Sequence, residues 1–325
     1  MKPIVVVGSI NMDLVCSVER IPIPGETLSG RSFATFHGGK GANQAVAVAR
    51  LGYPAHMLGK VGDDEFGARL RDGLQSAGVG VQSVTVGERL SSGVALISVD
   101  ASGENSIVIV AGANGAIQPA DVERWQALLG SAKMILMQLE IPMDAVECTA
   151  QIAEKLQVPV MLDPAPAREL SASLLQKITY LTPNETEAGA LCGASVAELN
   201  ATTAPEYAAS LLARGPRHVI LKMGQRGAYA LSQGGEAFSQ PAFRVQAVDS
   251  TAAGDAFNGA LAVALSRGGN LRQAARFAAA AAAISVGRAG AQPSMPRESE
   301  VECLLRSQPL TTTELDATAG VAAHD

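Results

Sequence analysis

The sequence predicts an α/β fold with a mainly parallel sheet, and two observations support this. Short runs of wholly apolar residues, such as Ile4–Val7, recur along the chain and are typical of strands buried on both faces of a sheet. Between these runs lie segments in which apolar residues recur at helical spacing. Strands that alternate with helices form right-handed βαβ units, so we expect a parallel sheet covered by helices.

The individual elements follow from these patterns in chain order. The expected strands are Ile4–Val7, Met134–Met137, Val158–Leu162, Ile178–Leu181 and Val219–Leu221. The expected helices among them are Gln44–Leu51, Phe66–Gln75, Ala120–Leu129, Met143–Leu156 and Ala204–Leu212. Two further helices are expected at Ala253–Ser266 and Leu271–Val286. Residues from about Thr311 onward lack apolar periodicity, which predicts one domain over residues 1–308 and a disordered tail over 309–325.

Two stretches, at about 12–35 and 81–110, interrupt this alternation. The second stretch contains the alternating runs Val94–Val99 and Ser106–Val110, separated by a turn with Gly103. Strict alternation around glycine-containing turns predicts antiparallel hairpins. We therefore expect a small β-sheet flap inserted into the α/β body, while extra edge strands of the main sheet are the alternative.

Composition excludes two classes of protein. Of the 325 residues 47% are hydrophobic and 17% are charged, against roughly 25% charged in an average protein. The net charge of −6 argues against a nucleic-acid partner, because such proteins need a basic surface to neutralise phosphates. The longest apolar stretch, Ala278–Val286, is far shorter than the ~20 residues of a membrane span, so we expect no membrane contact.

The cysteines and the N-terminus both favour a cytoplasmic protein. Cys16, Cys148, Cys192 and Cys303 are scattered and form no C-x-x-C pair, so neither a zinc site nor a disulfide framework is indicated. The apolar run near the N-terminus is too short for a secretory signal and is soon followed by polar residues.

The segment Asp249–Gly259 is the most informative one for function. Small residues at 252–254 let the backbone approach a ligand and begin a helix, whose first N–H groups bind anions. Asp255 follows directly, and a carboxylate beside bound phosphate is repelled unless it has a task. The expected task is to take a proton from a hydroxyl that attacks the phosphoryl group in line. From this motif alone, a plain helix cap is an equally good explanation.

A second segment, Phe36–Ala45, places three glycines in four positions before a helix. Its exposed backbone N–H groups, together with Lys40 and Asn43, offer donors to a polyhydroxylated ligand. The chain contains no G-x-x-x-x-G-K-[ST] loop. It also lacks G-x-G-x-x-G after the first strand, which disfavours a nicotinamide-dependent oxidoreductase.

Polar residues also follow several expected strands, at the edge where open α/β sheets bind ligands. Asn11 and Asp13 can grip sugar hydroxyls, although an Asx turn is the alternative, and Glu140 is placed similarly but is equally compatible with a surface acid. Asn184 and Glu187 are spaced to hold Mg²⁺ through its water shell. A capping box explains that pair better when it is considered alone.

Taken together, these segments resemble the ribokinase family, also called the phosphofructokinase B group. The resemblance extends from about residue 3 to about residue 300, and several segments in the right order carry it. They are Ser9–Asp13, Pro22–Thr27, Gly38–Ala45, Met137–Glu140, Asp163–Ala167, Asn184–Glu187, Ala252–Asp255 and Gly290–Ser294. The resemblance implies a three-layer α/β/α body with a mainly parallel sheet and a small β-sheet lid, which also builds a homodimer and shields the reaction from water.

For activity, the resemblance implies ATP-dependent phosphorylation of D-ribose at O5, with Asp255 as base and Ala253 and Gly254 as the anion hole. Implied sugar-binding residues are Asn11, Asp13, Gly39, Lys40, Asn43, Glu140 and Asp255. Implied nucleotide-binding residues are Asn184, Lys222, Gly224, Gly227, Gly254 and Ala279. Mg²⁺ is assigned to Asn184 and Glu187 through water. A potassium ion, which would fix the geometry of the anion-hole loop, is assigned to Asp249, Thr251, Ser285, Arg288, Gly290 and Ser294.

The chain departs from the family pattern at a few positions. Lys222 stands where Thr is frequent, Asp163 opens a segment that commonly begins with Asn, and Ser250 replaces a usual Thr. Ala279 replaces a His or Asn near the adenine, which puts that contact in doubt. Two alternatives stay open: a kinase of deoxyribose or another sugar, and a non-catalytic sugar sensor. A sensor with a degraded site would lose Asp255 or the Gly254 loop, and both are present.

Overall fold

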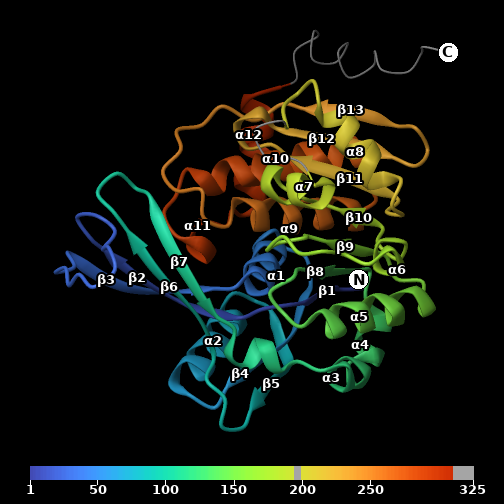
Figure 1. The fold of residues 1–325 in the computed structure, drawn as a ribbon. Coiled ribbons are helices and arrows are strands. Elements are labelled where there is room, and N and C mark those ends of the chain that lie inside the picture. The colour runs from blue at the N-terminus through green and yellow to red at the C-terminus, as the bar shows by residue number, and fades with distance from the viewer. Residues whose placement is uncertain (194–198, 310–325) are drawn as a thin grey trace.

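Nine strands form the large sheet in the computed structural model, which describes residues 1–193 and 199–309 (Figure 1). Their order across the sheet is β13-β12-β11-β10-β9-β8-β1-β4-β5. Seven neighbouring strands run parallel: β11 (His218–Lys222), β10 (Tyr180–Leu181), β9 (Val160–Leu162), β8 (Met134–Met137), β1 (Ile4–Val7), β4 (Ala55–Gly62) and β5 (Gly80–Gly87). At one end of the sheet, β12 (Ala228–Ser232) pairs antiparallel with β11, and the edge strand β13 (Ala237–Gln240) pairs antiparallel with β12. The predicted α/β fold with a mainly parallel sheet is confirmed.

Strand β1 shows how the sheet separates two hydrophobic cores. All four of its residues are fully buried between β4 and β8. Ile4 and Val6 face one core, whereas Val5 and Val7 face the other, because successive side chains of a strand point to opposite faces. This explains why the strand is wholly apolar instead of alternating.

Helices cover both faces of the sheet and complete the three layers (Figure 1). On one face lie α1 (Lys40–Arg50), α2 (Glu65–Ser76), α9 (Ala253–Ser266), α10 (Leu271–Val286) and α12 (Glu298–Ser307). On the other lie α3 (Pro119–Arg124), α4 (Gln126–Ser131), α5 (Met143–Lys155), α6 (Ala172–Leu175), α7 (Glu185–Cys192) and α8 (Ala204–Leu212). Helices α1 and α9 pack so closely that a Cβ on Gly259 would lie 2.6 Å from the Cβ of Ala47. This contact brings the beginnings of the two helices together.

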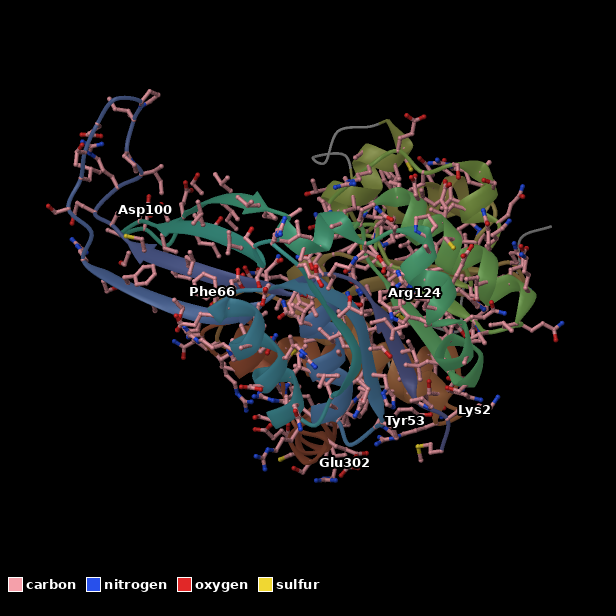
Figure 2. The ribbon with its side chains drawn as sticks, turned by 90° about the horizontal axis from the view of Figure 1, so that it is seen from below. Lys2, Tyr53, Phe66, Asp100, Arg124 and Glu302 are labelled. Carbon is pink, nitrogen blue, oxygen red and sulfur yellow. The ribbon has the colours of Figure 1, made fainter. Side chains whose placement is uncertain are left out.

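A second sheet of four strands projects from the body. It has the order β3-β2-β6-β7, with β3 (Ser32–Gly38), β2 (Asn11–Ser17), β6 (Gly93–Val99) and β7 (Asn105–Val110). The predicted hairpins are present, as β2–β3 and β6–β7 are antiparallel, and parallel pairing of β2 with β6 joins them. Figure 2 shows Asp100 at the far end of this sheet, away from the helices. We refer to these four strands as the lid.

The structure differs from the sequence-based expectations in several elements. Residues 81–87 were expected in the flap, but they belong to β5 at the edge of the large sheet, so only the part from residue 93 onward lies in the lid. Strand β4 and the hairpin β12–β13 were not predicted. The single helix expected at 120–129 divides at Trp125, where tighter i→i+3 bonds replace the α-helical pattern.

Two expectations concern the C-terminus and membranes. Apart from its first residue, the tail predicted at 309–325 lies outside the described residues. Across the described part of the chain, no helix has both the length and the apolar character needed to cross a bilayer.

Candidate active site

Polar residues gather where the parallel strands of the large sheet end. Asn11 follows β1, Glu140 follows β8, Asp163 follows β9, Asn184 follows β10 and Lys222 ends β11. Because the carboxyl ends of parallel strands meet at one edge, these side chains come from distant parts of the sequence to one region. The lid strand β2 begins at this edge and the lid strand β3 ends at it. We call it the carboxyl edge.

The glycine-rich segment before α1 fits tightly against the end of β1. Gly39 has φ +88°, and a Cβ there would lie 2.7 Å from the backbone nitrogen of Asn11, so only glycine is accommodated. The backbone N–H of Lys40 donates to Glu140 Oε2 at 3.1 Å, and the Ser9 hydroxyl donates to the same oxygen. The predicted residues Gly39, Lys40 and Glu140 therefore lie together, and Glu140 is not a free surface acid.

The ammonium group of Lys40 lies among acidic side chains at this edge. Burial alone would lower the pKa of Lys40, but Asp255, Asp163, Glu140 and Glu187 together raise it well above its ordinary value. Lys40 is also the first residue of α1, where the helix dipole is unfavourable for a cation. The charges of these carboxylates, and not the helix, thus stabilise the charged form of the lysine.

The carboxylate of Asp255 is buried and held by two amides of α1. Asn43 Nδ2 donates to its Oδ2 at 3.0 Å, and Gln44 Nε2 donates to its Oδ1 at 3.1 Å. Burial and the charge of Asp163 raise the pKa of Asp255 to about 6, although Lys40 and the two amides act in the opposite direction. Its side chain does not cap α9, whose N-cap residue is Ala252 without a side-chain cap. The plain-cap explanation is therefore wrong.

The first turn of α9 presents unused backbone donors. Ala252 adopts φ +60°, a left-handed conformation that is uncommon for a residue with a Cβ and that begins the helix. The N–H of Ala253 donates to the Ser250 carbonyl at 3.2 Å, whereas those of Gly254 and Asp255 have no partner among the described residues. A Cβ on Gly254 would lie only 3.4 Å from Lys222 Nζ. This end of α9 is suited to an anion.

Acceptors dominate the part of the site that faces the lid. Asp13 is only 9% exposed, and its burial, helped by the charges of Glu140 and Asp255, raises its pKa to about 7. Asn43 Oδ1 is buried and has no hydrogen-bond partner among the described residues. Asn11 and Asp13 lie within strand β2 and not in an Asx turn, and Asn11 Oδ1 accepts from Asn114 Nδ2 at 2.7 Å. Buried acceptors without donors suit a ligand rich in hydroxyl groups.

Asn184 and Glu187 form the capping box that the sequence favoured. The backbone N–H of Asn184 donates to Glu187 Oε2 at 2.7 Å, and that of Glu187 donates to Asn184 Oδ1 at 2.9 Å. Burial chiefly raises the pKa of Glu187, and Asp163 adds to this, while Lys222 acts against it. The second oxygen of Glu187 and the amide nitrogen of Asn184 take no part in the box, so the cap and a contact with hydrated Mg²⁺ are compatible.

The other positions predicted to bind nucleotide lie farther along the sheet. Lys222 ends β11 and is bridged to Asn184 in the sheet, so these two residues are neighbours. Gly224 has φ +52°, and at Gly227 a Cβ would lie 2.0 Å from the carbonyl oxygen of Gln240, so Gly227 is required by packing against β13. Ala279 is 8% exposed within α10 and offers only its methyl group.

The residues predicted to bind potassium lie in two segments that touch, which we call the two loops. One is the loop before α9, and the other runs from the last turn of α10 to the short helix Ala291–Ser294. Asp249 accepts from the backbone N–H of Thr251 at 2.9 Å and from that of Gly290 at 2.8 Å. Burial alone would raise its pKa, but these hydrogen bonds hold the pKa of Asp249 below the ordinary value. The hydroxyls of Ser285 and Ser294 are 2.8 Å apart, and the side chain of Arg288 pairs with Glu300. The loops thus offer carboxylate, hydroxyl and carbonyl oxygens, the donor chemistry that an alkali cation takes.

Within the described ranges, no group of three or more His, Cys, Asp or Glu side chains lies close enough to hold a metal ion. The assignments of Mg²⁺ and of potassium to named residues therefore stay predictions.

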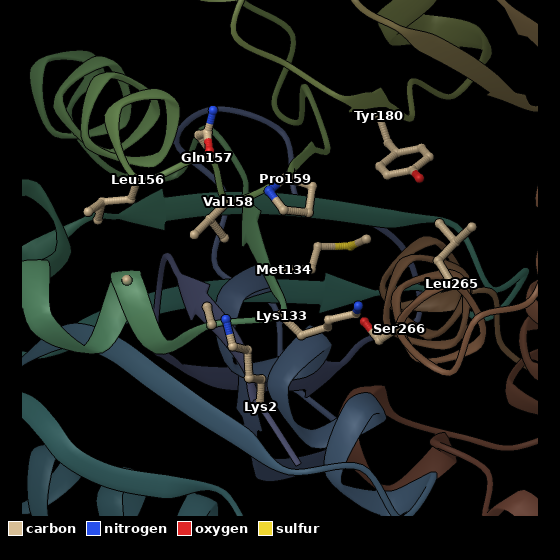
Figure 3. A pocket seen from close by; sticks show the side chains of 12 residues that line it. Lys2, Lys133, Met134, Leu156, Gln157, Val158, Pro159, Tyr180, Leu265 and Ser266 are labelled. Carbon is tan, nitrogen blue, oxygen red and sulfur yellow. The ribbon is translucent and has the colours of Figure 1, made fainter.

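A cavity of about 450 Å³ lies at the opposite, amino edge of the sheet (Figure 3). Lys2 and Lys133 line it beside Met134 and Val158, and both lysines are exposed. The helices α4, α5 and α9 all end at its wall, so their carbonyl ends face it. Lysines are favoured at such helix ends without any ligand, so we expect no second anion site in this cavity.

Sequence reasoning did not assign functional roles to four residues that the structure places in the site. Gln44 and Asp163 contact the groups around Asp255, Ser9 binds Glu140, and Asn114 binds Asn11. Gln44 and Asp163 lie in recognised motifs, which is the signal that pointed to them. Asn114 follows the lid strand β7 and carries no comparable signal.

Comparisons with known proteins agree with this geometry. Residues 1–298 match the family described as pfkB family carbohydrate kinase. The chain is 44% identical to a ribokinase of Schizosaccharomyces pombe over 92% of this chain and 96% of that protein. It is 40% identical to a deoxyribokinase of Salmonella typhi, over 90% and 95% of the two chains. The structure of Arabidopsis thaliana ribokinase complexed with ribose and ATP is similar with a TM-score of 0.87 at 36% identity, over 94% of this chain and 99% of that one.

Proposed function

The chain belongs to the pfkB family of carbohydrate kinases, and we propose that it phosphorylates D-ribose at O5 with ATP, using Asp255 as the catalytic base. The observation that carries this proposal is a juxtaposition. A buried carboxylate with a pKa near 6 lies in the same helical turn as two backbone N–H groups that have no partner among the described residues. A proton acceptor next to an anion site is the arrangement that transfer of a phosphoryl group to an alcohol requires.

The sugar binds in this proposal between the lid and the end of β1. Hydroxyl groups of ribose donate to the carboxylate of Asp13, which is largely buried, and to Asn43 Oδ1, which is buried and has no donor among the described residues. Lys40 compensates the negative charge that collects here, so that Asp255 remains ionised at neutral pH. Asp255 then removes the proton from the 5-hydroxyl of ribose while the hydroxyl oxygen forms a bond to the γ-phosphorus of ATP. The bond from this phosphorus to the bridging β,γ-oxygen breaks, and ADP leaves with its electron pair.

The nucleotide binds along the edge from α9 toward β11. The N–H groups at the first turn of α9 hold the phosphoryl group in line with the attacking hydroxyl, and Lys222 is close enough to contact its oxygens. Ala253 would join this anion hole after giving up its bond to Ser250. Gly224 and Gly227 lie on the nucleotide side, and the adenine contact of Ala279 is limited to its methyl group.

Two ions complete the proposed site. Asn184 and Glu187 would hold Mg²⁺ through water, and the ion would neutralise charge on the transferring phosphoryl group. The two loops that carry Asp249 and Ser294 would hold potassium, with backbone carbonyls of Thr251, Ser285, Arg288 and Gly290. These loops adjoin the beginning of α9, so a cation there fixes the position of the N–H donors.

The lid supports a proposal about assembly. The outer strand β7 is exposed along its whole length, and Ile107, Val108 and Ile109 are each 49–58% exposed. An exposed apolar edge strand is a surface that pairs with another chain. We therefore propose a homodimer formed through the lid, and sedimentation velocity would measure its mass.

We also propose that the protein is located in the cytoplasm. Its four cysteines are free, which agrees with a reducing compartment.

A coupled assay of ADP release tests the proposed reaction. D-ribose, 2-deoxy-D-ribose, D-fructose and nucleosides are compared as acceptors with wild-type protein and with Asp255→Asn. Ribose is expected to give the highest kcat/KM, and Asp255→Asn to lower kcat by about 10³-fold or more while the ribose Kd changes only a few-fold.

Three results would count against this proposal. A higher kcat/KM for deoxyribose would assign the substrate to the second sugar, for which the relative named deoxyribokinase is the argument. Full turnover by Asp255→Asn would reject the base. Ribose binding without any ADP release by the wild type would favour the non-catalytic sensor.

A further inference from the structure

The side-chain amide of Gln44 connects two carboxylates at the carboxyl edge. Its Nε2 donates to Asp255 Oδ1 and to Asp163 Oδ2, at 3.1 Å in both cases. Gln44 is 1% exposed and Asp163 is 2% exposed, so no bulk water competes for these bonds. An –NH₂ group has two hydrogens, and here each one serves a different carboxylate.

The orientation of this amide is fixed from behind. Gln138 Nε2 donates to Gln44 Oε1 at 2.7 Å, and Gln138 itself lies just beyond β8, fully buried. With the amide reversed, Gln44 Oε1 would face two carboxylate oxygens and Gln138 would lose its acceptor. Because the two carboxylate oxygens accept hydrogen bonds and cannot donate them, Gln44 directs its –NH₂ group toward the acids.

Asp163 connects this amide to the nucleotide side. Its other oxygen, Oδ1, accepts from Lys222 Nζ at 2.8 Å, in a pair whose side chains are 3% and 11% exposed. Lys222 in turn lies beside Gly254 at the beginning of α9. A continuous set of contacts therefore leads from the base through Gln44 and Asp163 to the lysine near the phosphate position.

We propose that Gln44 is a positioning residue that orients the carboxylate of Asp255 toward the sugar and couples it to the Asp163–Lys222 ion pair. The inference rests on the proposed function, because it assumes that Asp255 is the base. Gln44 shares Asp255 with Asn43, which donates to the other oxygen, so together the two amides fix the plane of the carboxylate. A misoriented base loses much of its rate advantage even when substrate still binds.

The test replaces Gln44 by Leu, with Gln75→Leu on the exposed face of α2 as the matched control. In Gln44→Leu, kcat should fall by about 10- to 100-fold while KM for ribose changes by less than about 3-fold. The acid limb of the pH profile of kcat should move up by about one pH unit, because Asp255 loses a donor to its ionised form. The other charged groups that face Asp255 are Lys40, Asp163 and Asp13, and all three remain.

A double-mutant cycle separates a role through Asp255 from a general structural one. In the Asp255→Asn background, Gln44→Leu should lower the residual kcat by less than about 2-fold, since there is no base left to orient. A full additional 10-fold loss in that background overturns the proposal. So does a folded Gln44→Leu protein whose kcat and acid limb equal those of the wild type.

Gln138→Met keeps the inference testable where Gln44→Leu does not fold. It leaves the donors of Gln44 in place but removes the bond that fixes them, so the same shift of the acid limb is expected with a smaller loss in kcat. An unchanged profile in a folded Gln138→Met protein contradicts the proposal. Failure of the proposed function itself is recognised separately, because then Asp255→Asn alone retains its turnover.

Discussion

The two edges of the large sheet both carry charged residues, but in different ways. At the carboxyl edge, Asp13, Asp163 and Asp255 are almost completely buried, and the pKa values of Asp13 and Asp255 are raised by burial and by neighbouring acids. At the amino edge, Lys2 and Lys133 are exposed beside the carbonyl ends of three helices (Figure 3). The exposed lysines keep their charge at no cost to the fold. Burial of the ionised carboxylates of Asp13 and Asp255, in contrast, lowers the stability of the folded chain when no ligand is bound. This difference distinguishes a ligand-binding site from charged residues that lie on the surface without a ligand.

The largest effect is expected from Lys40→Met, which is compared with a second single variant, Lys133→Met. Lys40→Met removes the cation that opposes Asp255, Asp163 and Glu140, so the pKa of Asp255 rises further and kcat/KM at pH 7 should fall by about 100-fold or more. Lys133→Met makes the same change at the amino edge. Steady-state kinetics of the two variants, with circular dichroism to verify folding, measure the contrast, and equal losses would contradict it.

A second prediction concerns the free energy of unfolding, which the burial of Asp13 lowers when this acid is ionised. Its pKa is raised from 3.8 to about 7 in the folded chain, so the folded state binds more protons than the unfolded state between these values. The contribution to stability is therefore fully present below pH 3.8 and is lost as the pH rises through 7. Asp13→Asn removes this loss and should raise the free energy of unfolding by about 2 kcal/mol at pH 8, while KM for ribose rises at least 10-fold.

Urea unfolding of the wild type and of Asp13→Asn at pH 8 and at pH 5 checks the direction of this pH dependence. The gain in stability should shrink at pH 5, because wild-type Asp13 is then largely protonated when folded. A variant that is less stable than the wild type at pH 8 would show that burial does not strain this acid. Asp144→Asn, at the beginning of α5, provides a control outside the cluster.

A third prediction concerns the two loops near the beginning of α9. Replacing potassium by sodium at constant ionic strength should lower kcat by about 5- to 10-fold, because the smaller, more strongly hydrated ion fits carbonyl donors less well and positions the N–H groups of α9 poorly. Asp249→Asn should abolish this difference between the ions. Equal activity in the two salts would reject the cation site.

The smallest effect is expected at the amino-edge cavity. Lys2→Gln and Lys133→Gln should each change kcat/KM by less than about 2-fold. In isothermal titration calorimetry, the wild type should bind no inorganic phosphate in this cavity at millimolar concentration. The reason is that these lysines already compensate helix ends. Saturable phosphate binding that is lost in Lys133→Gln would show that this edge is a second site after all.

The same contrast explains which parts of the molecule could be predicted from its sequence. Strands such as β1 and β8 are continuous apolar runs, and α8, α9 and α10 were predicted with their observed bounds because their periodicity is strong. Strand β4 contains His56, Gly59 and Lys60, which interrupt the pattern, so it was missed. Strand β5 alternates because it lies at an edge of the sheet, and this alternation placed it wrongly in the flap.

For the site, motifs indicated the residues, but only the fold could indicate their partners. Asn43 and Gln44 were recognised in the glycine-rich segment, yet their bonds to Asp255 span more than 200 positions and depend on how closely α1 packs against α9. The capping box at Asn184 is local and was anticipated. Pairings between distant loops depend on tertiary packing, which a single sequence does not display.

The most direct measurement is a crystal structure with D-ribose and a non-hydrolysable ATP analogue. It should place a carboxylate oxygen of Asp255 about 2.6–3.2 Å from the 5-hydroxyl, with the N–H of Gly254 directed at the terminal phosphate. If instead ribose lay beyond hydrogen-bond reach of Asp255, with no bridging water, or if the phosphates lay away from the beginning of α9, the proposed mechanism would be wrong.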